Sequence, residues 1–153
     1  MDEIDALIER IRANGHKVWV AGPQSDEAIV ELEQTLGVRM PPSFRDFLSR
    51  FGGFALGNSF ISGIINNKPL ATGTGRLYWD TQRFRREYGV PDHLLVVQPD
   101  EDAPYCLNMT APKPDGEVPM VCYELHSRHI GRIAGSFREW FVNWLQLRAE
   151  NEA

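Results

Sequence analysis

Cysteine is scarce in this sequence, which has two, Cys106 and Cys122, among 153 residues. Two thiols cannot form the network of disulfides that holds small secreted domains together, and a chain of this length folds without one. No stretch approaches the roughly 18 uninterrupted apolar residues that a membrane-spanning helix needs. The N-terminal Met1-Asp2-Glu3 is acidic, whereas a secretory signal begins with basic residues. We therefore expect a cytoplasmic protein with reduced thiols and no membrane partner.

An excess of positive charge is also missing. The chain has 16 Lys and Arg residues against 21 Asp and Glu, for a formal net charge of -5. Nucleic-acid binding normally requires a surplus of basic side chains on one face, so we expect no direct contact with nucleic acid. The length and a hydrophobic share of 42% fit one globular domain, which we place over residues 1–153.

Apolar residues at helical spacing predict helices at both ends of the chain. Residues 2–14 place apolar side chains at i, i+3, i+4 and i+7, and Gly15 follows as a C-terminal stop. The last helix opens with Ser136-Phe137-Arg138-Glu139, a capping box that satisfies free amides of the first turn. The remaining helices are expected from Ser25 to Leu36, from Pro41 to Phe51, and over residues 81–88.

Short apolar segments between these helices predict strands. From Phe54 to Trp79 such segments are separated by Gly and Asn turns. Residues 94–97, 105–109 and 120–125 alternate with Pro- and Asp-rich stretches, which fits an antiparallel meander. Because no β-α-β alternation is present, we predict an α+β fold, a mainly antiparallel sheet with helices from both termini packed on it.

Cysteine and histidine could combine in two kinds of site. Cys106, Cys122, His126 and His129 include the ligand types of a zinc centre, but the cysteines stand far apart, whereas zinc ligands come in tight pairs. A small hydrolase using one of these thiols with one of these imidazoles is the other alternative, and no nucleophile motif supports it. We therefore predict buried thiols, no metal, no cofactor and no catalytic residues.

Three acids, Asp100, Glu101 and Asp102, follow one another in a Pro-flanked loop. Neighbouring carboxyl groups can act as an acid–base pair when burial separates their pKa values. A Pro-flanked loop is normally solvated, so we expect exposed, charged groups.

Arg83, Arg85 and Arg86 alternate with aromatic residues. Such an array can stack bases and neutralise phosphates in a single-strand groove. The interpretation we prefer is an amphipathic helix with a charged outer face.

Residues 31–53 contain Leu36-Gly37, then Met40-Pro41, then Phe47-Leu48, and end in Gly52-Gly53. This order resembles the N-terminal signature of the SUKH superfamily, also known from yeast cell-wall regulators of the Smi/Knr type. The family prefers leucine where Met40 stands and often has asparagine where Gly52 stands. Both departures are mild, since methionine is apolar and glycine, like asparagine, tolerates the left-handed conformation that ends a helix.

The second half of the chain is similar to the same family in the order strand, turn, strand and Ser-Phe helix. These elements correspond to residues 105–109, 115–116, 119–124 and 134–140. Asn108 replaces an aspartate that is common at the end of the first of these strands. The resemblance spans about residues 24–146.

The resemblance implies a non-enzymatic domain that acts in bacteria as the antidote to a cognate toxin, frequently a nuclease or deaminase, by occlusion. Our hypothesis is that Asp100, Glu101 and Asp102 dock onto a basic surface of that toxin, with net negative charge steering the encounter. The alternative is an intracellular scaffold or regulatory domain of the same fold that binds a non-toxin protein. The oligomeric state stays open, because exposed strand edges can pair two copies or be covered by loops.

Overall fold

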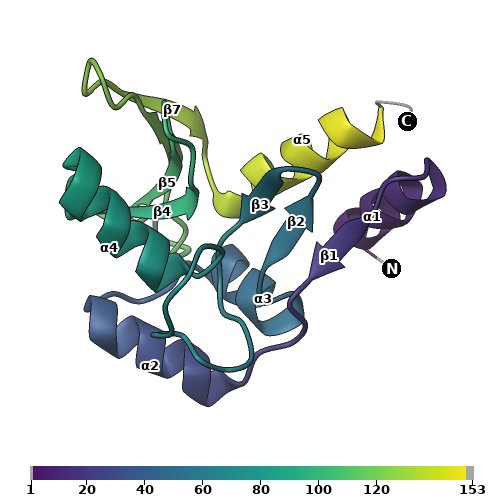
Figure 1. The fold of residues 1–153 in the computed structure, drawn as a ribbon, viewed down its shortest axis with the longest axis horizontal. Coiled ribbons are helices and arrows are strands. Elements are labelled where there is room, and N and C mark those ends of the chain that lie inside the picture. Colours follow the sequence, from purple (N-terminus) through teal and green to yellow (C-terminus); the bar gives the residue numbers. More distant parts are fainter. Residues whose placement is uncertain (1, 151–153) are drawn as a thin grey trace.

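The computed structural model describes residues 2–150 and contains five helices and two antiparallel sheets (Figure 1). In chain order the elements are α1 (Glu3–Ala13), β1 (Val18–Val20), α2 (Asp26–Leu36), α3 (Pro42–Arg50), β2 (Phe54–Leu56), β3 (Ser59–Ile61), α4 (Leu77–Tyr88), β4 (Leu94–Gln98), β5 (Tyr105–Asn108), β6 (Met120–Tyr123), β7 (Ile130–Ala134) and α5 (Phe137–Ala149). The predicted α+β fold is confirmed, with its strands divided between two sheets.

The helix ends follow the capping signals of the sequence. Ser25 Oγ accepts a hydrogen bond from the amide of Ala28 at 3.1 Å, and Gly37 ends α2 in the left-handed conformation. At the start of α5, Ser136 Oγ accepts from the amide of Glu139 at 3.1 Å, which is one half of a capping box, and Glu139 Oε2 accepts from the amide of Gly135 at 2.7 Å. These contacts satisfy amides that a helix leaves unpaired, so local sequence determines where the helices begin and end.

The strands pair in two separate antiparallel groups. The first sheet has the order β1-β2-β3 and the second the order β4-β5-β6-β7. The predicted meander therefore exists, extended by one more strand. The sheets are linked where the amide of Ser62, just after β3, donates to the carbonyl of Val97 in β4 at 2.7 Å.

Three local predictions need correction. The strand β7 was not predicted because Ile130 and Ile133 are exposed, so it lacks the alternation that a half-buried strand shows. The helix α4 begins at Leu77 rather than at residue 81. Residues 62–76 were expected to include strands, but they form turns and loop with a single bridge between Gly63 and Arg76.

The main core lies between the terminal helices, α3 and the inner faces of the sheets. The helices α1 and α5 pack side by side (Figure 1). Phe141 of α5 is fully buried, and its ring centroid lies 5.4 Å from that of Phe47 and 5.5 Å from that of Phe54. The aromatic face of the last helix is therefore core, as its spacing predicted.

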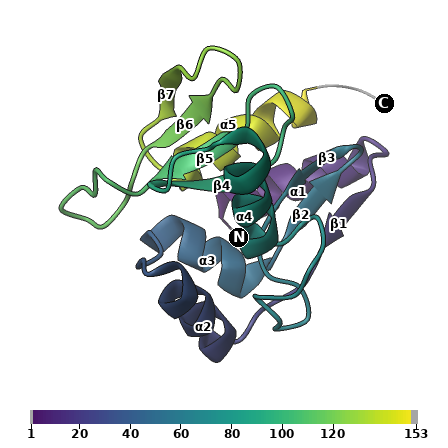
Figure 2. The ribbon, with the colours of Figure 1, turned by 60° about the vertical axis from the view of Figure 1, so that its left-hand side comes forward.

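A smaller core lies on the other face of the four-stranded sheet. There Phe84 of α4 packs against Val96, Cys106 and Val121. Figure 2 shows α4 lying over β4 in this region. None of the helices within residues 2–150 is long and apolar enough to cross a lipid bilayer.

Two glycines let separate backbone segments touch. The carbonyl of Gly52 accepts a hydrogen bond from the amide of Ile64 at 3.0 Å, and a Cβ placed on Gly63 would lie 1.7 Å from that carbonyl oxygen. Gly52 itself has a φ of 72°, which suits the helix end that the sequence placed there. The loop over residues 62–76 is thereby held against the end of α3.

Candidate protein-binding surface

The loop predicted to bind a partner joins β4 to β5 and is a fixed turn. Asp100 Oδ1 accepts hydrogen bonds from the amides of Asp102 at 2.8 Å and Ala103 at 3.0 Å. Asp100, Glu101 and Asp102 are all exposed, as expected of a Pro-flanked loop. None of them forms an ion pair with another residue in the range 2–150. Within that range no ion pair neutralises the loop, and the Asp100 carboxylate is held in place by two amides.

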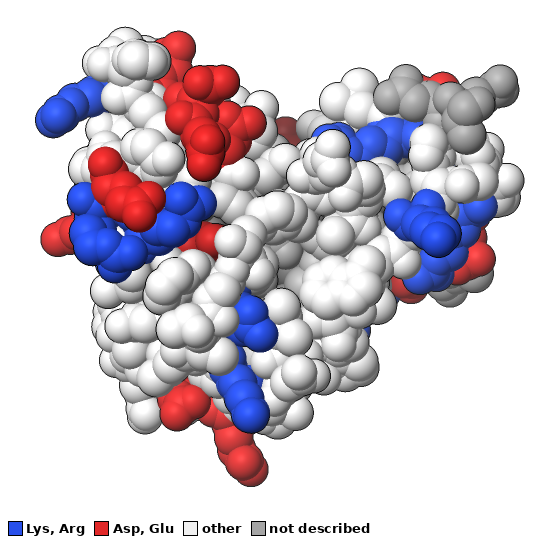
Figure 3. All heavy atoms as spheres, in the orientation of Figure 1, with Lys and Arg blue, Asp and Glu red and all other residues white. Residues whose placement is uncertain are grey.

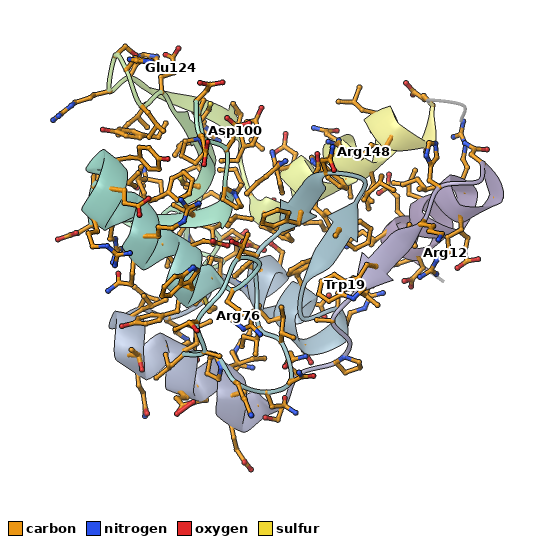
Figure 4. All side chains as sticks on the ribbon, in the orientation of Figure 1. Arg12, Trp19, Arg76, Asp100, Glu124 and Arg148 are labelled. Atoms are coloured by element: carbon orange, nitrogen blue, oxygen red, sulfur yellow. The ribbon has the colours of Figure 1, made fainter. Side chains whose placement is uncertain are left out.

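A fourth acid lies beside this loop. The amide of Leu125 donates to the carbonyl of Asp102 at 3.0 Å, so the segment that follows β6 is fastened to the acidic loop. Glu124 is exposed on that segment, and Figure 4 shows it with Asp100 on the same arm of the molecule. The negative charges of Glu124 and Asp100 both raise the pKa of the Cys122 thiol, after burial, which is the main cause. We call Asp100, Glu101, Asp102 and Glu124 the acidic patch.

Below the acidic patch the inner face of the sheet is only half covered. Tyr105 and Cys122 are direct partners across β5 and β6 and are half-buried, whereas the next pair on the same face, Leu107 and Met120, is fully buried. The Tyr105 ring centroid lies 5.8 Å from that of Trp140 in α5. The sheet therefore extends beyond the helix that covers it.

Arg148 of α5 lies on the other arm of the molecule, across from Asp100 in the same view (Figure 4). Its Cζ lies 3.4 Å from the centroid of the Trp144 ring, and its Nη1 donates to the Trp144 carbonyl at 3.1 Å. It makes no ion pair with any of the residues that the structure describes. Burial lowers the pKa of Arg148, and the guanidinium remains charged because its usual pKa is so high.

The acidic patch and Arg148 act in opposite directions on the pKa of Tyr105. Burial is the main cause that raises the pKa of its hydroxyl, Cys122 and Asp100 add to the increase, and the Arg148 charge opposes it. Arg148 also lines a pocket of about 380 Å³ together with Lys17 and Leu56. The two sides of this face therefore carry opposite charge.

The outer face of the three-stranded sheet adds an apolar area. Trp19, Ala55 and Phe60 pair across β1, β2 and β3, so their side chains share one face, and the opposite face enters the core. Trp19 is 48% exposed, unusual for so large an apolar side chain. We call these three residues the apolar sheet face.

Figure 3 shows these features on one side of the molecule. The surface is hollowed between the acidic residues of one arm and the basic residues of the other. The Trp19 ring lies on the same side, below the hollow (Figures 3 and 4). We call the hollow, its two charged sides and the apolar sheet face together the concave face.

The family model of SUKH_5, described as SMI1-KNR4 cell-wall, matches residues 4–146. This chain belongs to the SUKH family. A crystal structure of a protein from Pseudomonas syringae pv. tomato is similar at a TM-score of 0.60 with 20% sequence identity, over 96% of this chain and 99% of that chain. This similarity supports the fold alone, because the identity is low.

The two thiols of this SUKH domain lie in surroundings that disfavour the thiolate. Cys106 is fully buried, as predicted, but the prediction is wrong for Cys122, which is only half-buried, and burial raises the pKa of both. His126 and His129 lie exposed in the turn between β6 and β7. Because the thiolate is the nucleophile, this environment argues against the hydrolase alternative. Within residues 2–150 no cluster of three His, Cys, Asp or Glu side chains could hold a metal ion.

The arginines of α4 in the SUKH domain are largely engaged in local contacts. Arg83 forms an ion pair with Glu87 at 3.2 Å, and Arg85 Nη2 donates to the carbonyls of Asp92 at 2.7 Å and Leu94 at 3.2 Å. Phe84 between them is fully buried. The prediction of an amphipathic helix is confirmed, and of the three arginines only Arg86 is exposed.

Sequence reasoning missed a buried acid, Asp80 of α4. Its Oδ2 accepts from Ser62 Oγ at 2.5 Å and from the amide of Gly75 at 3.0 Å, and burial raises its pKa. Asp80 lies three residues after Leu77 and four before Phe84, so helical spacing places all three on the inner face. This spacing is the sequence signal that could have identified the buried acid. Since its partners lie in the 62–76 loop, Asp80 fastens that loop to the helix.

Proposed function

We propose that this SUKH domain is a bacterial immunity protein that neutralises a cognate toxin by direct contact in the cytoplasm. Membership of the family supports this proposal. The observation that carries it is the acidic patch, whose exposed carboxylates form no ion pairs within residues 2–150. Two backbone amides hold the Asp100 carboxylate of this patch in place.

A toxin that cleaves or deaminates nucleic acid fits this patch by charge. Such an enzyme needs a basic surface to hold its substrate, because the phosphate backbone supplies most of the binding free energy. Carboxylates docked on that surface compete with phosphate and exclude the substrate, so occlusion needs no chemical step. The net charge of -5 favours the encounter with a basic partner.

Co-expression with the product of the neighbouring gene tests the proposal. Growth should stop when that product is expressed alone and recover when the SUKH domain is expressed with it, and the two proteins should co-purify. A neighbouring product that binds but is harmless supports the scaffold alternative. Absence of both binding and rescue contradicts the proposed function.

The acidic loop can be tested in the same system. Replacing Asp100, Glu101 and Asp102 by Ala should slow association about tenfold or more at low salt and flatten its salt dependence, with little change in stability. The matched control removes three exposed acids elsewhere, Glu27, Glu31 and Asp92. If both triple variants associate at the same rate, the loop lies outside the interface.

A further inference from the structure

The concave face carries more than the acidic patch that the proposed function uses. We propose, on the basis of that function, that the partner inserts a convex protein element into this face. The element has basic side chains toward the acidic patch, an acidic side chain toward Arg148, and an apolar side chain against Trp19 and Phe60. The docking surface is therefore defined by both signs of charge and an aromatic anchor.

Arg148 supplies the positive side of this surface. Arg148 is half-buried and has no anionic partner among residues 2–150, so within that range it has lost part of its hydration without gaining a compensating charge. Stacking on Trp144 and the hydrogen bond to the Trp144 carbonyl hold its guanidinium in place before any partner arrives. Lys17, which is exposed, lines the same pocket. A carboxylate of the partner would meet both cations there.

Trp19 supplies the apolar anchor. Interfaces between proteins commonly have an apolar centre with a charged rim, and tryptophan is enriched among the residues that contribute most binding free energy. Its ring lies over Gly53 of the neighbouring backbone, since a Cβ placed on Gly53 would be 3.6 Å from Trp19 Cζ3. Phe60 continues the same row of side chains two strands away. An exposed Trp19 next to the half-buried Ala55 and Phe60 fits an apolar side chain of a partner.

Charge and shape favour a foreign protein as the occupant. Phosphates of a nucleic acid would be repelled by the acidic patch, so one side of the face would oppose such a ligand. A second copy placed by a two-fold axis would set one hollow against another and leave the centre of the contact unfilled. A convex protein element carrying both charge signs satisfies both sides and the hollow between them.

The test uses the purified SUKH domain and the product of the neighbouring gene as probe, with affinity and rates measured at two salt concentrations. Trp19→Ser should weaken binding about 30-fold or more, as loss of a central anchor does. Arg148→Gln should weaken it about tenfold, mainly through faster dissociation, with partial rescue in Arg148→Lys. The controls are Val30→Ser, which changes another exposed apolar residue, and Arg86→Gln on α4. Thermal melting of every variant shows that it is folded.

The outcomes separate the inference from the proposed function. If wild type binds the probe and Trp19→Ser and Arg148→Gln bind as tightly as the controls, the inference is overturned and the proposed function survives. If wild type neither binds the probe nor rescues growth, the proposed function fails and the inference with it. If wild type forms a dimer that Trp19→Ser makes monomeric, the occupant is a second copy. If a short single-stranded RNA binds wild type but not Trp19→Ser, the occupant is nucleic acid. Either of these last two results overturns the inference.

Discussion

Replacing Gly63 by Ala adds one methyl group where two backbone segments touch. The new Cβ would lie 1.7 Å from the carbonyl oxygen of Gly52 and 2.8 Å from its carbon, whereas real Cβ atoms essentially never approach closer than 3.0 Å. The two segments would therefore have to separate by more than about 1 Å, beyond what a packed interior accommodates without strain.

The separation breaks the hydrogen bond between these segments and moves Gly63 away from a further partner at the start of α4. The amide of Ile64, which is fully buried, donates to the Gly52 carbonyl at 3.0 Å, and the amide of Leu77 donates to the Gly63 carbonyl at 2.8 Å. Each buried amide left without a partner costs about 1–3 kcal/mol. We therefore expect Gly63→Ala to lower the free energy of unfolding by about 3–6 kcal/mol, a large share of the total for a small domain.

Urea unfolding followed by tryptophan fluorescence measures this difference, since the chain has four tryptophans. Gly53→Ala is the matched control, because its Cβ would have no neighbour closer than 3.6 Å, which is ordinary contact. That variant should change the free energy of unfolding by less than about 1 kcal/mol. Equal urea midpoints for the two variants would refute the close approach of Gly52 and Gly63.

Three further outcomes are expected. Phe141→Ala should lower the free energy of unfolding by about 3–5 kcal/mol in the same urea assay, because removal of its fully buried ring leaves a cavity. A loss under about 1 kcal/mol would contradict its central place in the core. Cys106 should resist iodoacetamide in the folded protein and react after denaturation, as mass spectrometry can show, because the thiol is buried and its pKa is raised. Asp80 has a folded pKa above 3.8, so the native state binds its proton more tightly and stability falls as pH rises through that higher pKa. Wild type should therefore gain stability relative to Asp80→Asn as the pH is lowered from 7 towards 4, and a gap that is constant with pH would show that Asp80 is not buried in this way.

Features that depend on neighbours along the chain could be read from the sequence. The helices begin at Ser25 and Ser136 because a side-chain oxygen can cap amides three residues away, which requires nothing from the rest of the fold. The exposure of the acids at residues 100–102 was also predicted from local sequence, because a loop flanked by prolines normally lies in water. Burial of Phe141 followed from helical spacing alone.

Tertiary structure alone decided which distant residues share a surface. Glu124 joins the acidic patch only because strand pairing brings the ends of β5 and β6 together, and periodicity along one strand does not specify its partner. Arg148 and Trp19 lie far apart in the chain, and the packing of α5 and of the first sheet places both on the concave face. Hydrophobic pattern and caps act over a few residues and determined the elements of this protein. The binding surface arises from contacts between those elements, whose free energies depend on the whole packed core.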